Sequence, residues 1–184
     1  LPIGERIRLS FTMPLDDPRQ PLAETFKERG LYTMAVVDDG YGEFLSPKMG
    51  LKRGFDHYEL VDQLPKSKRN DKGTIDLALK VLNQRPEGQP FFLWVHLFGP
   101  HDPNQTHPST RKFGKKLIDR YDHEIAYMDT QLGRMLNTLD ELSQEEPITL
   151  AITSDHGELF TGRRRYHGVN LHEQGIRVPL IISG

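Results

Sequence analysis

The 184-residue sequence contains no cysteine, which excludes disulfides, thiolate metal ligands and a cysteine nucleophile within the chain and leaves its redox compartment open. It also lacks any apolar run near the ~20 residues of a membrane span, and no signal peptide is visible. Neither charge sign is in large excess, because the formal net charge is only −2. We therefore expect no membrane segment in this chain and no nucleic-acid partner.

The length is that of one domain of ordinary size or of a large piece of one. The first residue is Leu1 rather than Met, and the chain stops in Leu180-Ile181-Ile182-Ser183-Gly184, a run typical of the end of a strand. We expect residues 1–184 to form a single α/β domain that is itself a fragment of a longer protein.

Helical and strand patterns alternate along the chain after an irregular lead-in at 1–20 and around loops at 38–70. The patterns predict helices at 22–29, 74–83 and 118–142, and strands at 32–37, 91–95, 148–153 and 177–182. The apolar stripe from Ile118 to Leu142 is expected to face the core. The run 91–95 is almost wholly apolar, which is typical of a strand covered on both faces. The alternation predicts a largely parallel sheet with helices on both faces.

The most informative segment is Thr153-Ser154-Asp155-His156-Gly157-Glu158, directly after the apolar stretch 148–152. A carboxylate and an imidazole are ligand types that suit a divalent cation, and open α/β sheets place their sites at the carboxyl ends of strands. Neighbouring residues on a regular strand point to opposite faces. Asp155 and His156 can therefore reach one metal only if the strand has ended, and we expect Gly157 to let the backbone turn there.

Two further histidine clusters follow predicted strands or lie in the polar loop beyond them. His101 follows the 91–95 strand, and His167 precedes a glycine in the loop after Glu158. Loops at the same edge of one sheet can meet, so a joint histidine and carboxylate site is geometrically reasonable. The structural alternatives are an Asp155 that caps a turn and a His101 that is an ordinary turn residue.

The other histidines have simpler interpretations. His96 is expected to pack at a strand end, and His107, His123 and His172 are expected to be surface or packing residues. Arg177 is expected to form an ion pair, with Glu173 as the candidate partner.

In order along the chain, these segments resemble the sulfatase branch of the alkaline phosphatase superfamily. The resemblance covers roughly residues 20–184. Its motifs are Pro100-His101-Asp102-Pro103 for Pro-His-x-Pro, the helical stretch Tyr121 to Asp129, the metal segment 153–158, His167-Gly168, and Glu173 through Ile182. The resemblance implies an α/β fold with a largely parallel sheet between helices, of which this chain is an incomplete part.

The resemblance also implies residue roles. Asp155 and His156 would be two ligands of a divalent metal ion. Calcium is favoured because many sulfatases bind it with Asn at the second place, and manganese, magnesium or zinc stay open because family branches with His at that place use these metals. His101 would hydrogen-bond the transferring sulfate or phosphate and assist the leaving group. His167 lies one residue from the place where many members hold the anion with a Lys. The partner would be a small anionic sulfate or phosphate ester, and the family suggests a periplasmic or other extracytoplasmic location.

One departure from the family pattern limits what the chain can do. Sulfatases carry a formylglycine nucleophile made from Cys or Ser in a Cys/Ser-x-Pro-x-Arg segment, and no residue here fits that pattern. We expect this chain to be part of a metallohydrolase that cleaves sulfate esters and to be inactive by itself. The alternatives are a phosphoglycerol transferase or a phosphonate or phosphodiester hydrolase of the same superfamily, and a non-catalytic α/β module.

Overall fold

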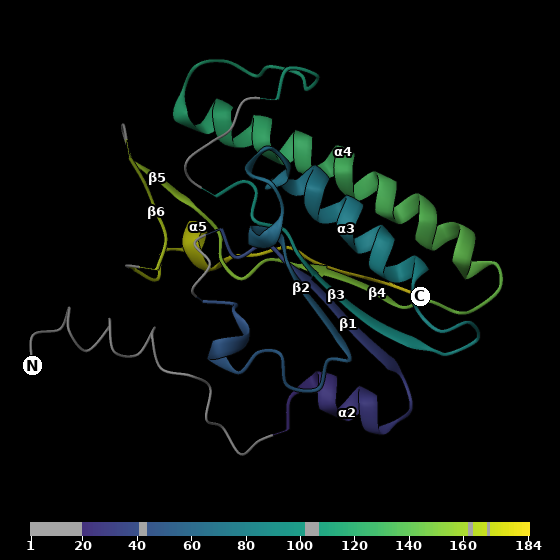
Figure 1. The fold of residues 1–184 in the computed structure, drawn as a ribbon. Coiled ribbons are helices and arrows are strands. Elements are labelled where there is room, and N and C mark those ends of the chain that lie inside the picture. Colours follow the sequence, from purple (N-terminus) through teal and green to yellow (C-terminus); the bar gives the residue numbers. More distant parts are fainter. Residues whose placement is uncertain (1–19, 41–43, 102–106, 162–163, 169) are drawn as a thin grey trace, which may run out of the picture. The chain divides into compact units, whose positions relative to one another are not determined.

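The computed structural model describes residues 20–40, 44–101, 107–161, 164–168 and 170–184 (Figure 1). Most of the predicted lead-in and two positions of the Pro-His-x-Pro motif, Asp102 and Pro103, lie outside these residues. Backbone contacts group the chain into two compact units, residues 1–99 and 100–184, each of which is considered by itself. The single domain expected from the sequence therefore stays a prediction.

A three-stranded parallel sheet forms the centre of the first unit, in the order β2-β1-β3. The strands are β1 (Tyr32–Val37), β2 (His57–Leu60) and β3 (Phe91–His96). Val37 pairs with both Leu60 and His96, so all three strands end at the same level. Loops that follow these strands consequently begin along one edge of the sheet. The sequence prediction of a parallel sheet is confirmed, whereas β2 was missed within the expected loops at 38–70.

Helices cover this sheet on both sides (Figure 1). Helix α2 (Leu22–Glu28) packs against β1, and α3 (Asp71–Asn83) packs against β1 and β3. Short 3₁₀ turns at Pro47–Met49, Val61–Gln63 and Lys66–Lys68 fill the connections. The buried strand is β1, in which Met34 to Val37 are fully covered, while every residue of β3 is only partly buried. Residues 91–95 are therefore less covered than the apolar run predicted, and the fully buried strand is β1, the central strand of this three-stranded sheet.

The second unit contains the long helix α4 (Leu117–Ser143) and the short α5 (Glu173–Ile176). Its strands are β4 (Leu150–Thr153), β5 (Leu159–Thr161), β6 (Arg164–Tyr166) and β7 (Leu180–Ser183). Strands β4 and β7 pair antiparallel, as do β5 and β6. The connection from β4 to β7 contains the β5–β6 pair and α5 rather than a full crossover helix, so the chain returns beside β4 in the opposite direction. The sheet is therefore parallel only in the first unit.

Helix α4 spans the predicted range, but its buried face differs from the predicted apolar stripe. The buried positions are Glu124, Tyr127, Gln131 and Met135, whereas Ile118 and Ile125 are 47% and 38% exposed. Of the predicted stripe, only Met135 is buried. None of the helices in the described ranges combines the length and apolarity that a membrane crossing requires.

Candidate functional site

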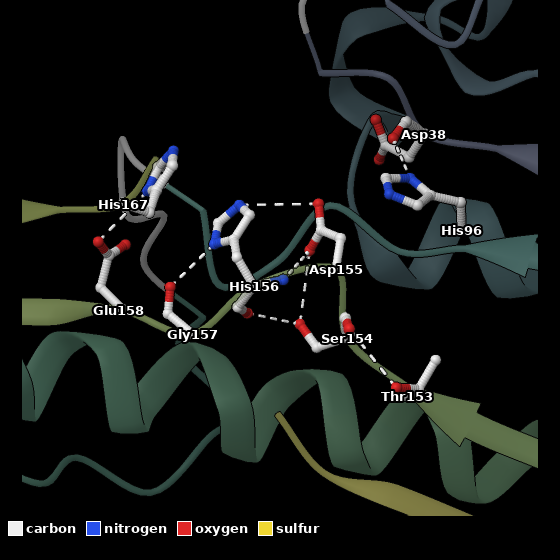
Figure 2. A network of polar contacts seen from close by, with 9 residues as sticks. All are labelled: Asp38, His96, Thr153, Ser154, Asp155, His156, Gly157, Glu158 and His167. Atoms are coloured by element: carbon white, nitrogen blue, oxygen red, sulfur yellow. Dashed lines mark hydrogen bonds and ion pairs between the residues drawn. The ribbon is translucent and has the colours of Figure 1, made fainter. Parts of the chain in front are cut away.

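The segment that follows β4 folds into a tight hydrogen-bonded turn (Figure 2). The backbone amide of His156 donates to Asp155 Oδ1 over 2.9 Å, and the hydroxyl of Ser154 donates to the carbonyl oxygen of His156 over 2.8 Å. Thr153 Oγ1 donates to the carbonyl oxygen of Pro179 over 2.9 Å, which ties the end of β4 to the start of β7. The strand thus ends before Asp155, as the two-ligand hypothesis requires.

Gly157 is required here by close packing. Its backbone amide donates to the carbonyl oxygen of Gly175 over 2.9 Å, and a Cβ placed on it would overlap the carbonyl oxygen of Gln174. Its φ does not lie in the left-handed region that favours glycine. The chain does turn here as expected, but glycine is needed for close packing rather than for a left-handed backbone, since the absent side chain lets the 155–158 turn lie against α5.

Asp155 and His156 present one donor atom each toward a common point. His156 Nδ1 lies 2.9 Å from the carbonyl oxygen of Gly157, which can only accept, so Nδ1 carries the proton and Nε2 keeps its lone pair. That Nε2 lies 3.7 Å from Asp155 Oδ2. Donor atoms bound to one ion at about 2.1 Å are separated by about 3–4 Å, so the pair fits two positions of a metal shell.

Both side chains are open to solvent. The Asp155 side chain is 73% exposed and the His156 side chain 34%. Within the described ranges no third carboxylate, imidazole or thiolate completes a metal-binding group. A pocket of about 480 Å³ lies in front of the two residues, a size typical of small-molecule sites, and its other lining residues are Gly168, Asn170, Leu171, Gly175 and Ile176.

All four site residues predicted from the sequence belong to the second unit, and three of them are histidines whose rings are linked through His167. The rings of His156 and His167 stack with centroids 4.1 Å apart and planes 16° apart. His101 meets His167 edge-on at 5.0 Å. The structure therefore brings His101, His156 and His167 together, with Asp155 beside His156.

Glu158 is a fifth residue of this candidate site, which the sequence analysis included in the 153–158 segment without giving it a role. Its side chain is 5% exposed, and Oε1 lies 3.3 Å from His167 Nδ1 (Figure 2). A glutamate in a polar loop is ordinarily a solvated residue. The available signal was its place two residues after the predicted ligand pair, within the motif itself.

A second histidine cluster docks residues 107–111 on helix α4. His107 Nε2 lies 2.9 Å from Glu124 Oε2, and its ring lies nearly parallel to that of Tyr127 with centroids 3.5 Å apart. The backbone amide of His107 donates to His123 Nε2 over 3.1 Å, and His123 Nδ1 contacts the carbonyl oxygen of Arg111 at 2.9 Å. The expectation of packing roles for His107 and His123 is confirmed.

The first unit places polar groups at the ends of β1 and β3. His96 Nδ1 lies 2.7 Å from the backbone oxygen of Asp38, which confirms that His96 packs at a strand end (Figure 2). Burial raises the pKa of both Asp38 and Asp39. Asp39 is 4% exposed, and its Oδ2 has no hydrogen-bond partner among the described residues. We therefore expect the charge of these carboxyl groups to lower the stability of the folded chain.

Comparison with known proteins finds sulfatases, both among family models and among individual relatives. The family model described as Sulfatase matches residues 8–184. Human iduronate 2-sulfatase is 33% identical over 69 residues, which are 38% of this chain and 12% of that protein. The chain therefore matches only a small part of this relative's length.

Three solved structures share the fold. A protein of the alkaline phosphatase superfamily from Vibrio parahaemolyticus matches with a TM-score of 0.63 and 18% identity, covering 89% of this chain and 40% of that one. The C-terminal periplasmic domain of EptC from Escherichia coli, in complex with zinc, gives 0.64 and 16%, covering 95% and 57%. The lipoteichoic acid synthase LtaP from Listeria monocytogenes gives 0.64 and 14%, covering 94% and 50%. The chain thus spans about half the length of these structures.

Proposed function

Because this chain belongs to the sulfatase family, we propose that it forms part of the catalytic domain of a hydrolase that cleaves sulfate esters. The observation that carries the proposal is that the rings of His156 and His101 both contact His167, with Asp155 beside His156. Asp155 and His156 also line a pocket. A substrate of this class is small and anionic, so a site that joins a cation to hydrogen-bond donors suits it.

Asp155 and His156 would hold a divalent metal ion, because Oδ2 and Nε2 converge and the His156 Nδ1 proton is already bound by Gly157. When bound, such an ion would supply positive charge to polarise an anionic ester oxygen. Calcium is favoured, and manganese, magnesium and zinc are alternatives, since imidazole is a ligand that transition metals accept well. The remaining ligands and the nucleophile would come from outside the matched residues.

His101 and His167 would bind and orient the transferring group. His101 would donate a hydrogen bond to the ester and hold a proton for the leaving oxygen. His167, stacked on His156, would hold an anionic oxygen beside the proposed metal ligands. The exposed face of the pocket is consistent with entry of an ester from solvent.

The second candidate is phosphoryl transfer, as in a phosphoglycerol transferase or a phosphonate or phosphodiester hydrolase. The observation that favours it is the imidazole of His156 at the second ligand position, where many sulfatases have an amide. For either reaction we propose an extracytoplasmic location, in keeping with the periplasmic domain among the structures that share the fold.

The test is an assay of the intact protein with 4-nitrophenyl sulfate and 4-nitrophenyl phosphate, with and without added divalent metal. We expect metal-dependent hydrolysis of the sulfate ester that falls at least about 100-fold in His101→Ala, the usual worth of an acid–base group. Preference for the phosphate ester would favour the second candidate. Absence of both activities in the metal-loaded intact protein would support the non-catalytic module.

A further inference from the structure

The plane of the His167 ring is set by its neighbours. His156 stacks on it at 4.1 Å and 16°, and His101 meets it edge-on at 5.0 Å. Contacts of this kind fix the plane of an imidazole but not its orientation within the plane, because a half-turn about the Cβ–Cγ bond exchanges nitrogen and carbon positions with little change of shape. Some other group must decide which edge of the ring carries Nδ1.

The Glu158 carboxylate is the group that distinguishes the two orientations. Its Oε1 lies 3.3 Å from His167 Nδ1, and its side chain is only 5% exposed. A carboxylate oxygen can only accept, so the proton of this contact belongs to Nδ1. The opposite half-turn would place a ring carbon against a buried carboxylate and leave that charge without this partner, which is unfavourable.

We infer that Glu158 is a positioning residue that holds His167 with Nδ1 protonated and with Nε2 as the atom that faces the substrate. The inference deepens the proposed function and rests on it for the chemical role of His167. Because Nδ1 donates to Glu158, Nε2 is the ring nitrogen that remains for a proton shared with the substrate.

Both stacked rings follow one design. His156 Nδ1 donates to the carbonyl oxygen of Gly157. His167 Nδ1 donates to the carboxylate of Glu158, the residue that follows Gly157 in the chain. Gly157 and Glu158 therefore decide that Nδ1 carries the proton in His156 and in His167. The Nε2 atom of each ring stays available to a ligand or the substrate. Such outer partners commonly decide the tautomer and the direction of a working histidine.

The first test is NMR of the histidine ring nitrogens at about pH 8, where an ordinary imidazole is neutral. In the wild type we expect His167 as a single tautomer with a proton on Nδ1 and none on Nε2. Glu158→Gln keeps an acceptor and is expected to keep this pattern, whereas Glu158→Ala is expected to show both tautomers. The matched control is Glu173→Gln, an exposed glutamate paired with Arg177, which is expected to leave the His167 signals unchanged.

A wild-type His167 with its proton on Nε2 would overturn the inference even if Glu158→Ala failed to fold. An unchanged pure Nδ1–H tautomer in folded Glu158→Ala would overturn it as well.

The second test is the kinetics of the intact protein on 4-nitrophenyl sulfate. Glu158→Ala is expected to lower kcat/KM about tenfold, mostly through KM, with partial rescue in Glu158→Gln. A protein with no esterase activity but the expected tautomers would refute the proposed function alone. An active protein whose kinetics ignore Glu158→Ala would refute the positioning role alone.

Discussion

The backbone amide of Gly157 donates a hydrogen bond to the carbonyl oxygen of Gly175, 2.9 Å away. This contact holds the turn that carries Asp155 and His156 against helix α5. Gly157→Ala would place a methyl group on the carbonyl oxygen of Gln174, so we expect a loss of about 2–3 kcal/mol in the free energy of unfolding, a usual result of overpacking. Thermal or urea unfolding of the chain measures it.

The same substitution at Gly175 is the matched control. No atom lies within 4 Å of a Cβ on Gly175, and the residue lies within a helix, where alanine is preferred to glycine by about 0.5–1 kcal/mol. Gly175→Ala is therefore expected to be neutral or slightly stabilising. Equal losses in the two variants would contradict the close-packing explanation.

Because His107 and Glu124 form a buried pair, we expect substitution of His107 to lower the stability of the chain strongly. The sequence pattern alone predicted an ordinary surface or packing residue. His107→Ala removes a hydrogen bond to a carboxylate that is 5% exposed and a ring stacked on Tyr127. We expect a loss of about 2–3 kcal/mol in the free energy of unfolding, because a bond to a charged group is worth about 1.5–3 kcal/mol. Exposed His172→Ala should change stability by less than about 0.5 kcal/mol. A His107→Ala variant as stable as His172→Ala would show that the pair does not anchor residues 107–111.

Asp39 gives a pH dependence whose sign follows from its environment. Burial raises the pKa of this carboxyl, although backbone amides of Leu45 and Phe44 oppose the change. A folded-state pKa above the unfolded value means that folding favours the protonated form, so stability is lost as pH rises through the folded pKa. Asp39→Asn removes the buried charge.

Asp39→Asn should therefore be more stable than the wild type at neutral pH and nearly equal to it below about pH 4, the unfolded value for aspartate. Urea unfolding across this range tests the prediction. The control is Asp76→Asn, whose parent side chain is exposed. Its difference in stability from the wild type should not grow comparably as the pH rises. A difference for Asp39→Asn that is constant with pH would show that charge burial is not its cause.

Alanine substitutions at Gly54 and Gly88 distinguish the cost of backbone strain from the cost of atomic overlap, because both glycines have a left-handed backbone and only one is crowded. Gly54 has φ of 85°, and a Cβ there would overlap the backbone of Glu24; Gly88 has φ of 70° with open space around it. Gly88→Ala should lose about 1 kcal/mol from the conformation alone, whereas Gly54→Ala should lose about 3 kcal/mol or more. Unfolding midpoints in urea compare the two, and similar losses would mean that α2 yields to the added methyl group.

Much of the fold and the candidate site follows from the sequence because the decisive segments are strongly patterned. The apolar run 32–37 is observed as β1 with the predicted bounds, and the Glu173–Arg177 ion pair is confirmed at 3.1 Å. His101, His156 and His167 meet as the motif positions suggested. Strand β2 was missed because its four residues, His57 to Leu60, are too few and too polar to show a clear alternation.

The errors share a physical origin. The predicted apolar stripe of α4 assumed that polar residues face solvent, yet Glu124 is buried because His107 satisfies its carboxylate. Glu158 was given no role of its own because its partner His167 lies nine residues further along the chain. Satisfied polar pairs of this kind depend on tertiary contacts that no local pattern contains.

The central claim is that Asp155 and His156 are metal ligands of a sulfatase-family site. The direct measurement is the divalent-metal content of the intact protein after loading and removal of free metal, for the wild type, Asp155→Ala, His156→Ala and the exposed control His172→Ala. We predict that the first two variants lose the bound metal while His172→Ala retains it as the wild type does. A wild-type metal content in Asp155→Ala and His156→Ala would contradict the claim.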